Sequence, residues 1–334
     1  MANIVVLGAG GWGTALAIMA HRHGNAVTLW SAFPEELDSI RRHGQHKKLL
    51  PGVAVSPHIE MTDDLACVKG ADLVILAVPS FAICEMAKKL ADVLPAGALL
   101  VNVGKGIDAE SNRLFGDLLT EMLPAARVAV LSGPSHAEEV ARAVPTSVVS
   151  AAADAATAEE VQKILMNPAF RIYANTDMVG VELGGAMKNV IALSAGIADG
   201  LDMGDNAKAA LMTRGLSEIA RLGVAMGARP ETFAGLSGMG DLIVTCGSMH
   251  SRNRRAGILI GQGMLPAEAI RKVGTVEGYL AVAAARTLAE RYGVELPISE
   301  QCYRICYEGM APKEALAALM QRPRNYETDR NWLG

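Results

Sequence analysis

Two charged side chains in this sequence stand in surroundings that favour acid–base chemistry. Lys188 lies within residues 181–193, where nearly every neighbour is small or apolar, so a helix formed there would be buried. A buried lysine is costly unless it is paired, has a lowered pKa or performs a function, and a function is our prediction over a structural ion pair. Asp241 follows the glycine-rich residues 235–240. We expect it to partner a buried lysine, although an aspartate after glycine is also a common helix N-cap.

A third candidate is Lys105, which stands between two glycines directly after an apolar run. If that run is a buried strand, the amine projects beyond the carboxyl end of the strand, where ligands of parallel sheets gather. A surface lysine in a turn is the alternative.

A fourth group is Ser251-Arg252-Asn253, which opens a predicted helix. Guanidinium and amide donors beside the free N–H groups of a helix N-terminus bind phosphate well. An arginine run taken alone is more often a solvated face.

The N-terminal glycines predict a dinucleotide site. Gly8, Gly10 and Gly13 follow an apolar run and precede a helix-like stretch, which is the G-x-G-x-x-G arrangement. The first glycine suits a tight turn, the second lets the backbone approach a pyrophosphate, and the third allows close helix–strand packing. The competing interpretation is a turn that is merely rich in glycine.

The elements that must position these residues fall into two groups. Short apolar runs without strict alternation predict buried parallel strands with helices between them. They are 4–7, 26–30, 72–78, 98–103 and 127–131, with 146–150 and 170–173 flanking a helix near Thr157 and extending the same sheet. From about Val179 the pattern is helix after helix. We therefore predict an α/β fold, with a Rossmann doubly wound parallel sheet in residues 1–178 and an all-α substrate domain in residues 179–334, and a substrate cleft between them.

Composition narrows the class of protein. The 334 residues are 51% hydrophobic but only 4% aromatic, which is typical of packed helices around a buried sheet. No apolar run is long enough to cross a bilayer, and a strand begins within three residues of Met1, so we expect a cytoplasmic protein without a secretory signal. Scattered basic residues and a net charge of −4 argue against a nucleic-acid surface. Five cysteines lack metal-type spacing, so we assign no metal and no disulfide.

The ordered motifs closely resemble those of bacterial NAD(P)-dependent glycerol-3-phosphate dehydrogenases, over essentially the whole chain. They are residues 8–17, 49–52, 105–106, 131–135, 188–189, 238–242, 251–253 and 276–278, followed by Arg322-Pro323 and Glu327.

The resemblance implies a role for each matched position. Lys188 would be the proton donor and acceptor, with Lys105 and Asp241 completing the catalytic group. The implied substrate-binding residues are Lys105, Gly133, Ser135, Lys188, Asn189, Asp241, Thr245, Ser251, Arg252 and Asn253. The implied cofactor-binding residues are Gly8, Gly10, Gly11, Trp12, Gly13, Ala32, Lys105, Ala137, Arg252, Thr275 and Glu277.

The implied reaction is reversible reduction of dihydroxyacetone phosphate to sn-glycerol 3-phosphate with NADH or NADPH, which serves glycerophospholipid synthesis. A developing alkoxide at C2 needs a proton and nearby positive charge, and the two lysines offer both. The resemblance also implies a homodimer.

Three positions depart from the pattern of the family. Gly11 stands where serine is common, and His136 replaces a usual phenylalanine. After the second strand, Ser31-Ala32-Phe33 offers neither the base that suits a 2′-phosphate nor the acid that selects NAD. Arg41 and Arg42 follow about ten residues later, more consistent with a helix surface than with a cofactor contact. These residues therefore predict no preference between NAD and NADP.

Two other functions compete with this one. A related dehydrogenase acting on 6-phosphogluconate, a 3-hydroxy acid or ketopantoate would share the architecture, but Ser251-Arg252-Asn253 with Lys105 favours a small phosphorylated ketone. A catalytically silent NAD(P)H sensor would not need Lys105, Lys188 and Asp241 together.

Overall fold

A computed structural model describes residues 1–324 and 326. Glu327, the last residue on which the resemblance rests, lies outside them. The chain divides into two compact units. The sheet unit comprises Met1–Gly104 and Phe115–Met178, and the helical unit comprises Lys105–Leu114 and Val179–Gly334. The domain boundary predicted from the sequence at residue 178 assigned residues 105–114 to the sheet domain. In the structure these residues belong to the helical unit.

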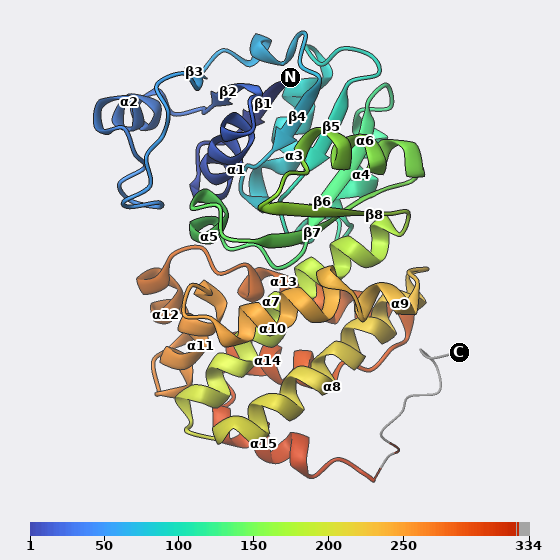
Figure 1. Ribbon diagram of the computed structural model, residues 1–334. Coiled ribbons are helices and arrows are strands. Elements are labelled where there is room, and N and C mark those ends of the chain that lie inside the picture. Colours follow the sequence, from blue (N-terminus) through green and yellow to red (C-terminus); the bar gives the residue numbers. More distant parts are fainter. Residues whose placement is uncertain (325, 327–334) are drawn as a thin grey trace. The chain divides into compact units, whose positions relative to one another are not determined.

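The sheet unit is built on one eight-stranded sheet (Figure 1). In sequence order the strands are β1 (Asn3–Leu7), β2 (Ala26–Trp30), β3 (Glu60–Thr62), β4 (Leu73–Leu76), β5 (Leu99–Asn102), β6 (Arg127–Ser132), β7 (Thr146–Ala152) and β8 (Phe170–Asn175). Their spatial order is β3-β2-β1-β4-β5-β6-β7-β8. The order reverses direction next to β1, so the predicted doubly wound fold is confirmed.

Helices cover both faces of this sheet. They are α1 (Gly11–Arg22), α2 (Pro34–His43), α3 (Ile83–Ala91), α4 (Phe115–Met122), α5 (Ala137–Ala141) and α6 (Ala155–Leu165). Alternate residues of β1 enter two separate cores: Ile4 and Val6 pack with α1 and α6, and Val5 and Leu7 pack with α3 and α4. Burial on both faces explains why the strands read as continuous apolar runs.

The sheet differs from expectation at one edge strand and at the pairing of β6 with β7. Strand β3 is only three residues, Glu60–Thr62, and its mixed composition has no apolar run to reveal it. Strand β7 runs antiparallel to β6, whereas all other neighbours are parallel. The connection between them holds only the five-residue helix α5, which does not carry the chain back across the sheet.

The helical unit is organised around one buried helix. This is α7 (Met178–Gly200), in which every residue from Gly180 to Ala198 is buried. The other helices are α8 (Gly204–Ala225), α9 (Pro230–Phe233), α10 (Asp241–Gly247), α11 (Arg252–Gly261), α12 (Pro266–Val273), α13 (Glu277–Tyr292), α14 (Pro297–Tyr307) and α15 (Pro312–Met320). A π-helical turn, Leu236–Gly240, leads directly into α10. Ile107 and Leu114 pack into the same core, which ties residues 105–114 to this unit.

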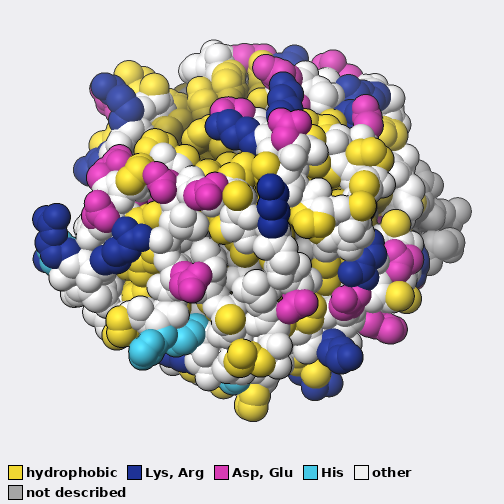
Figure 2. All heavy atoms as spheres, turned by 90° about the horizontal axis from the view of Figure 1, so that it is seen from above, with side chains coloured by type: hydrophobic (Ala, Val, Ile, Leu, Met, Phe, Trp, Pro, Cys, Tyr) yellow, Lys and Arg dark blue, Asp and Glu magenta, His cyan; other side chains and the backbone are white. Residues whose placement is uncertain are grey.

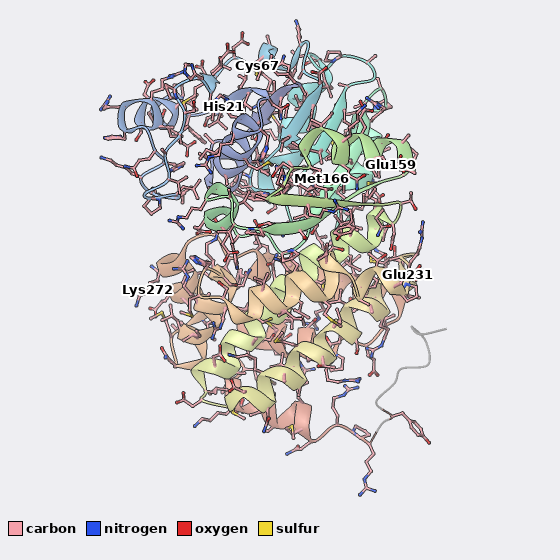
Figure 3. The ribbon with its side chains drawn as sticks, viewed as in Figure 1. His21, Cys67, Glu159, Met166, Glu231 and Lys272 are labelled. Atoms are coloured by element: carbon pink, nitrogen blue, oxygen red, sulfur yellow. The ribbon has the colours of Figure 1, made fainter. Side chains whose placement is uncertain are left out.

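The surface is mixed in character. Acidic and basic side chains are interspersed over the face shown in Figure 2. Glu159 on α6, Glu231 on α9 and Lys272 on α12 are examples of exposed charged positions (Figure 3). Among the described residues, no helix has both the length and the apolar character that a membrane span requires.

Candidate active site

The glycine turn after β1 has the shape that a dinucleotide pyrophosphate requires. Gly8 has a φ of +121°, and a Cβ there would lie 2.6 Å from the carbonyl oxygen of Ala77. A Cβ on Gly13 would lie 1.9 Å from the carbonyl oxygen of Gly8. At Gly10, by contrast, a Cβ would meet nothing within 4 Å, so the backbone faces open space at the N-terminus of α1. No side chain caps that terminus, and its first turn has no acidic residue, so the chain itself leaves an anion site there.

The end of β2 contains a contact that the sequence analysis missed. Ser31, which is buried, donates from its hydroxyl to Oε2 of Glu36 at 2.9 Å. The other carboxylate oxygen, Oε1, lies 3.5 Å from Nε2 of His46. Ala32 and Phe33, which lie between Ser31 and Glu36 in the sequence, are exposed. The signal that would have pointed to Glu36 is its place in the first turn of the helix that follows β2.

The helical unit brings three of the predicted charged residues together. The Lys105 amine donates to Oδ2 of Asp241 at 2.7 Å, and the Lys188 amine donates to Oδ1 of the same carboxylate. Lys188 also donates to the hydroxyl of Thr245 at 2.8 Å. Thr245 lies one turn after Asp241 on α10 and donates in turn to the Asp241 carbonyl oxygen at 2.6 Å. Asp241 is 1% exposed and Lys188 is 6% exposed, so these charges have little water around them.

Burial and charge set the pKa values of this cluster. Burial lowers the pKa of Lys188 to about 8; Asp241 opposes this shift and Lys105 reinforces it. Burial alone would raise the pKa of Asp241, but the charges of Lys105 and Lys188 outweigh it and hold that pKa below its usual range. Asp241 is therefore an ionised carboxylate between two amines, one of which exchanges its proton near neutral pH.

Glycines explain how Asp241 reaches Lys188. A Cβ on Gly184, one turn before Lys188, would lie 2.8 Å from the carbonyl oxygen of Ser237. A Cβ on Gly238 would lie 2.1 Å from the carbonyl oxygen of Phe233. The π-helical turn can lie against α7 only because Gly184 has no side chain, and it can lie against the end of α9 only because Gly238 has none. Helix α10 then begins with Asp241 facing the lysine.

The predicted phosphate site at α11 is joined to α7 by two asparagines. Asn253 donates from Nδ2 to Oδ1 of Asn189 at 2.8 Å, and its own Oδ1 accepts from the Gly278 N–H at 2.8 Å. Ser251 caps α11 by accepting from the Arg254 N–H at 3.2 Å. Both asparagines are buried, whereas Arg252 is exposed.

The remaining predicted residues lie in two places. Thr275 and Glu277 stand at the start of α13, beside Gly278, in the helical unit. Gly133, Ser135 and Ala137 lie between β6 and α5 in the sheet unit, where the Ser135 hydroxyl donates to the Gly133 carbonyl oxygen at 2.9 Å.

Comparison with known proteins identifies the family. A family model described as the N-terminus of NAD-dependent glycerol-3-phosphate dehydrogenase matches residues 3–158, and one for the C-terminus of the same enzyme matches residues 177–317. The chain belongs to the NAD-dependent glycerol-3-phosphate dehydrogenase family. The resemblance stated from the motifs is thereby confirmed.

Curated relatives and solved structures agree. The chain is 54% identical over 329 residues to a glycerol-3-phosphate dehydrogenase [NAD(P)+] of Moorella thermoacetica, with 98% of each chain covered. A crystal structure of glycerol-3-phosphate dehydrogenase from Coxiella burnetii is 36% identical and superposes with a TM-score of 0.92, over 96% of this chain and 99% of that one. As a glycerol-3-phosphate dehydrogenase, the protein is an oxidoreductase that uses NAD(P).

A more distant likeness concerns the fold alone. A ketopantoate reductase from Ralstonia eutropha shares 17% identity and a TM-score of 0.61, over 94% of this chain and 99% of that one. The architecture is thus shared with the competing dehydrogenase class, while the family match separates the two.

Proposed function

We propose that this dehydrogenase reduces dihydroxyacetone phosphate to sn-glycerol 3-phosphate, reversibly, with Lys188 as the group that gives and takes the proton. The observation that carries this proposal is the buried cluster of Lys188, Asp241 and Lys105. In the cell the product would enter glycerophospholipid synthesis in the cytoplasm.

The chemistry of the cluster matches the needs of a carbonyl reduction. A bound NAD(P)H supplies a hydride to the C2 carbon of the ketone. Lys188 delivers a proton to the C2 oxygen as negative charge develops there, and the second amine, Lys105, adds positive charge. With both amines protonated and Asp241 ionised, the cluster carries one net positive charge. Asp241 and Thr245 hold Lys188 in place, since both contact its amine.

We assign the substrate phosphate to the start of α11. Arg252 is exposed there, beside the N-terminal N–H groups of the helix. The side-chain amide of Asn253 is hydrogen-bonded to Asn189 and to the Gly278 N–H, and these bonds hold α11 in place beside α7. Gly133 and Ser135 remain proposed substrate contacts.

The proposed cofactor contacts follow the glycine turn. They are Gly8, Gly10, Gly11, Trp12, Gly13, Ala32, Lys105, Ala137, Arg252, Thr275 and Glu277. The open backbone at Gly10 supports the pyrophosphate part of this assignment. We also propose the homodimer that the resemblance implies, and sedimentation velocity would test it against the 35.1 kDa mass of one chain.

The decisive experiment removes the proton donor. Turnover is followed as loss of NADH absorbance at 340 nm with dihydroxyacetone phosphate, and with ketopantoate and hydroxypyruvate as control substrates. Lys188→Ala should lower kcat at least about a hundredfold, the scale of general acid–base catalysis, with NADH affinity retained. Lys272→Ala, at an exposed lysine of α12, is the matched control and should behave as wild type. Near-normal turnover by folded Lys188→Ala would refute the assignment.

A further inference from the structure

We propose that Glu36 makes the adenosine end of the cofactor site selective for NAD(H) over NADP(H). This inference rests on the proposed cofactor site and deepens it. In doubly wound folds the side chains just after the second strand meet the adenosine ribose, where an acid accepts from the 2′-hydroxyl and a base accommodates a 2′-phosphate. Ala32 and Phe33 offer neither group. The tertiary structure supplies an acid from the next helix.

The carboxylate of Glu36 is held at the end of β2 from two sides. Ser31, the first residue after β2, donates to Oε2 at 2.9 Å, and the Ser31 hydroxyl also accepts from the Phe33 N–H at 3.2 Å. His46 approaches Oε1 at 3.5 Å and is itself buried, with Nδ1 accepting from the Leu49 N–H at 3.3 Å. That bond leaves the other ring nitrogen, Nε2, to carry the proton toward Glu36. The side chain of Glu36 is still 31% exposed, so its charge reaches the adjoining surface.

The same contacts keep Glu36 ionised. Burial alone would raise the pKa of Glu36, but the proximity of His46 and the hydrogen bond from Ser31 outweigh burial and lower that pKa below its usual range. At neutral pH a carboxylate therefore stands where a 2′-phosphate, which carries nearly two negative charges, would have to be placed. Repulsion between them disfavours NADPH, whereas a 2′-hydroxyl meets no such penalty.

The basic side chains near this end are poorly placed to offset that charge. The ring of His46 already faces Glu36. Arg41 is bound to Asp38 at 2.8 Å and also donates to the Met61 carbonyl oxygen. Lys48 is exposed, and its charge helps to lower the pKa of Glu36.

Direct binding tests this inference without recourse to turnover. Dissociation constants for NADH and NADPH are measured by calorimetry on wild type, Glu36→Gln and Glu35→Gln, at low and high salt. We expect wild type to bind NADH about tenfold more tightly than NADPH, a ratio that Coulomb repulsion across a partly screened surface can supply. Glu36→Gln should reduce this preference for NADH over NADPH at least about threefold, and added salt should reduce the preference of the wild-type protein.

Glu35→Gln is the matched control. It removes the same charge from the same helical turn, at an exposed position one residue away, and should leave the ratio within about twofold of wild type because exposed charges are well screened. Ser31→Ala, which frees the carboxylate from its anchor, should narrow the ratio in part. Thermal melting checks that each variant is folded. If Glu36→Gln is not folded, the affinity ratio of Ser31→Ala tests the inference instead.

Two results would overturn the inference. One is equal or tighter binding of NADPH by wild type, and the other is an equal effect of Glu35→Gln and Glu36→Gln on the ratio. Failure of the proposed cofactor site would look different, because neither dinucleotide would then bind.

Discussion

At the scale of single residues, the proposed mechanism depends on one amine. Lys188 is buried and shares the Asp241 carboxylate with Lys105. The carboxylate keeps the amine charged and aimed, while burial and the second amine make the proton easier to lose. A pKa of about 8 is the result, so both protonation states are accessible near neutral pH.

This pKa predicts opposite pH profiles for the two directions. In the proposed mechanism reduction needs protonated Lys188, so the kcat/KM for reduction should fall as pH rises through about 8. Oxidation needs the neutral amine, so its kcat/KM should rise through the same range. Thr245→Val removes a hydroxyl that accepts from the ammonium form, so both midpoints should move to lower pH. Thr245→Ser keeps the hydroxyl and is the control. Rate profiles in both directions test this, and an unshifted midpoint in Thr245→Val would contradict it.

At the scale of elements, close packing of two helices sets the geometry around Lys188. A Cβ on Gly196 of α7 would lie 2.2 Å from the Arg254 carbonyl oxygen, and a Cβ on Gly257 of α11 would lie 2.2 Å from the Leu193 carbonyl oxygen. The two backbones can approach this closely only where side chains are missing. The contact fixes the start of α11, with Arg252 and Asn253, relative to Lys188.

We therefore predict that Gly257→Ala pushes α11 away from α7. The unfolding free energy should fall by about 1–3 kcal/mol, as is usual for overpacking, and KM for dihydroxyacetone phosphate should rise more than KM for NADH. Gly247→Ala is the control, since a Cβ there would meet nothing within 4 Å. Urea unfolding and steady-state kinetics provide the measurements. A Gly257→Ala enzyme with unchanged stability and KM would show that the two helices can separate freely.

A second helix contact predicts a pH-dependent stability. Glu218 of α8 accepts from the backbone N–H groups of Ile298 and Ser299 at the start of α14. Burial raises the pKa of Glu218 to about 7, although these hydrogen bonds oppose the shift. Between pH 4.5 and 7 the folded state then binds more protons than the unfolded state, so stability falls as pH rises.

Glu218→Gln cannot ionise, so it should lack this contribution. Its unfolding free energy, relative to wild type, should increase between pH 5 and pH 7.5. Urea unfolding at the two pH values measures the difference. A difference that does not change with pH would mean that Glu218 titrates normally.

At the scale of the whole molecule, the chain builds two units but does not divide them at a single point. Residues 105–114 leave the sheet unit after β5, place Lys105 beside Asp241 and bury Ile107 and Leu114 among the helices. The chain then returns to the sheet unit with α4. An amine of the proposed catalytic cluster, that of Lys105, is thus supplied to the helical unit by a segment that precedes the rest of that unit by more than sixty residues.

This excursion makes a prediction about stability. Leu114→Ala should destabilise the protein by about 2–5 kcal/mol, as expected for a buried leucine. Hydrogen exchange should locate the loss in α7 and α13 rather than in β1 and β4. Leu49→Ala, at an exposed leucine, is the control. Faster exchange in the sheet alone would show that residues 105–114 do not support the helical core.

The sequence by itself determined the class of fold and predicted the main reactive groups. Apolar runs indicate buried strands, the glycine turn predicts a dinucleotide site, and a lysine in an apolar helix predicts an amine with an unusual pKa. Each of these signals depends on near neighbours in the chain. The sequence did not predict strand β3, because that strand is short and mixed in composition. It did not predict the direction of β7, because the residues of one strand do not specify which strand it pairs with or in which direction.

Only the tertiary structure decided which groups meet. Lys105 and Asp241 are 136 positions apart, and Lys188 and Asp241 are 53 apart, so no local pattern specifies that one carboxylate serves both amines. The pKa of Lys188 depends on that meeting and on burial. Likewise, the carboxylate of Glu36 lies at the end of β2 only because the first turn of α2 packs against Ser31. Charge interactions act through space, and the positions in space are set by packing rather than by order along the chain.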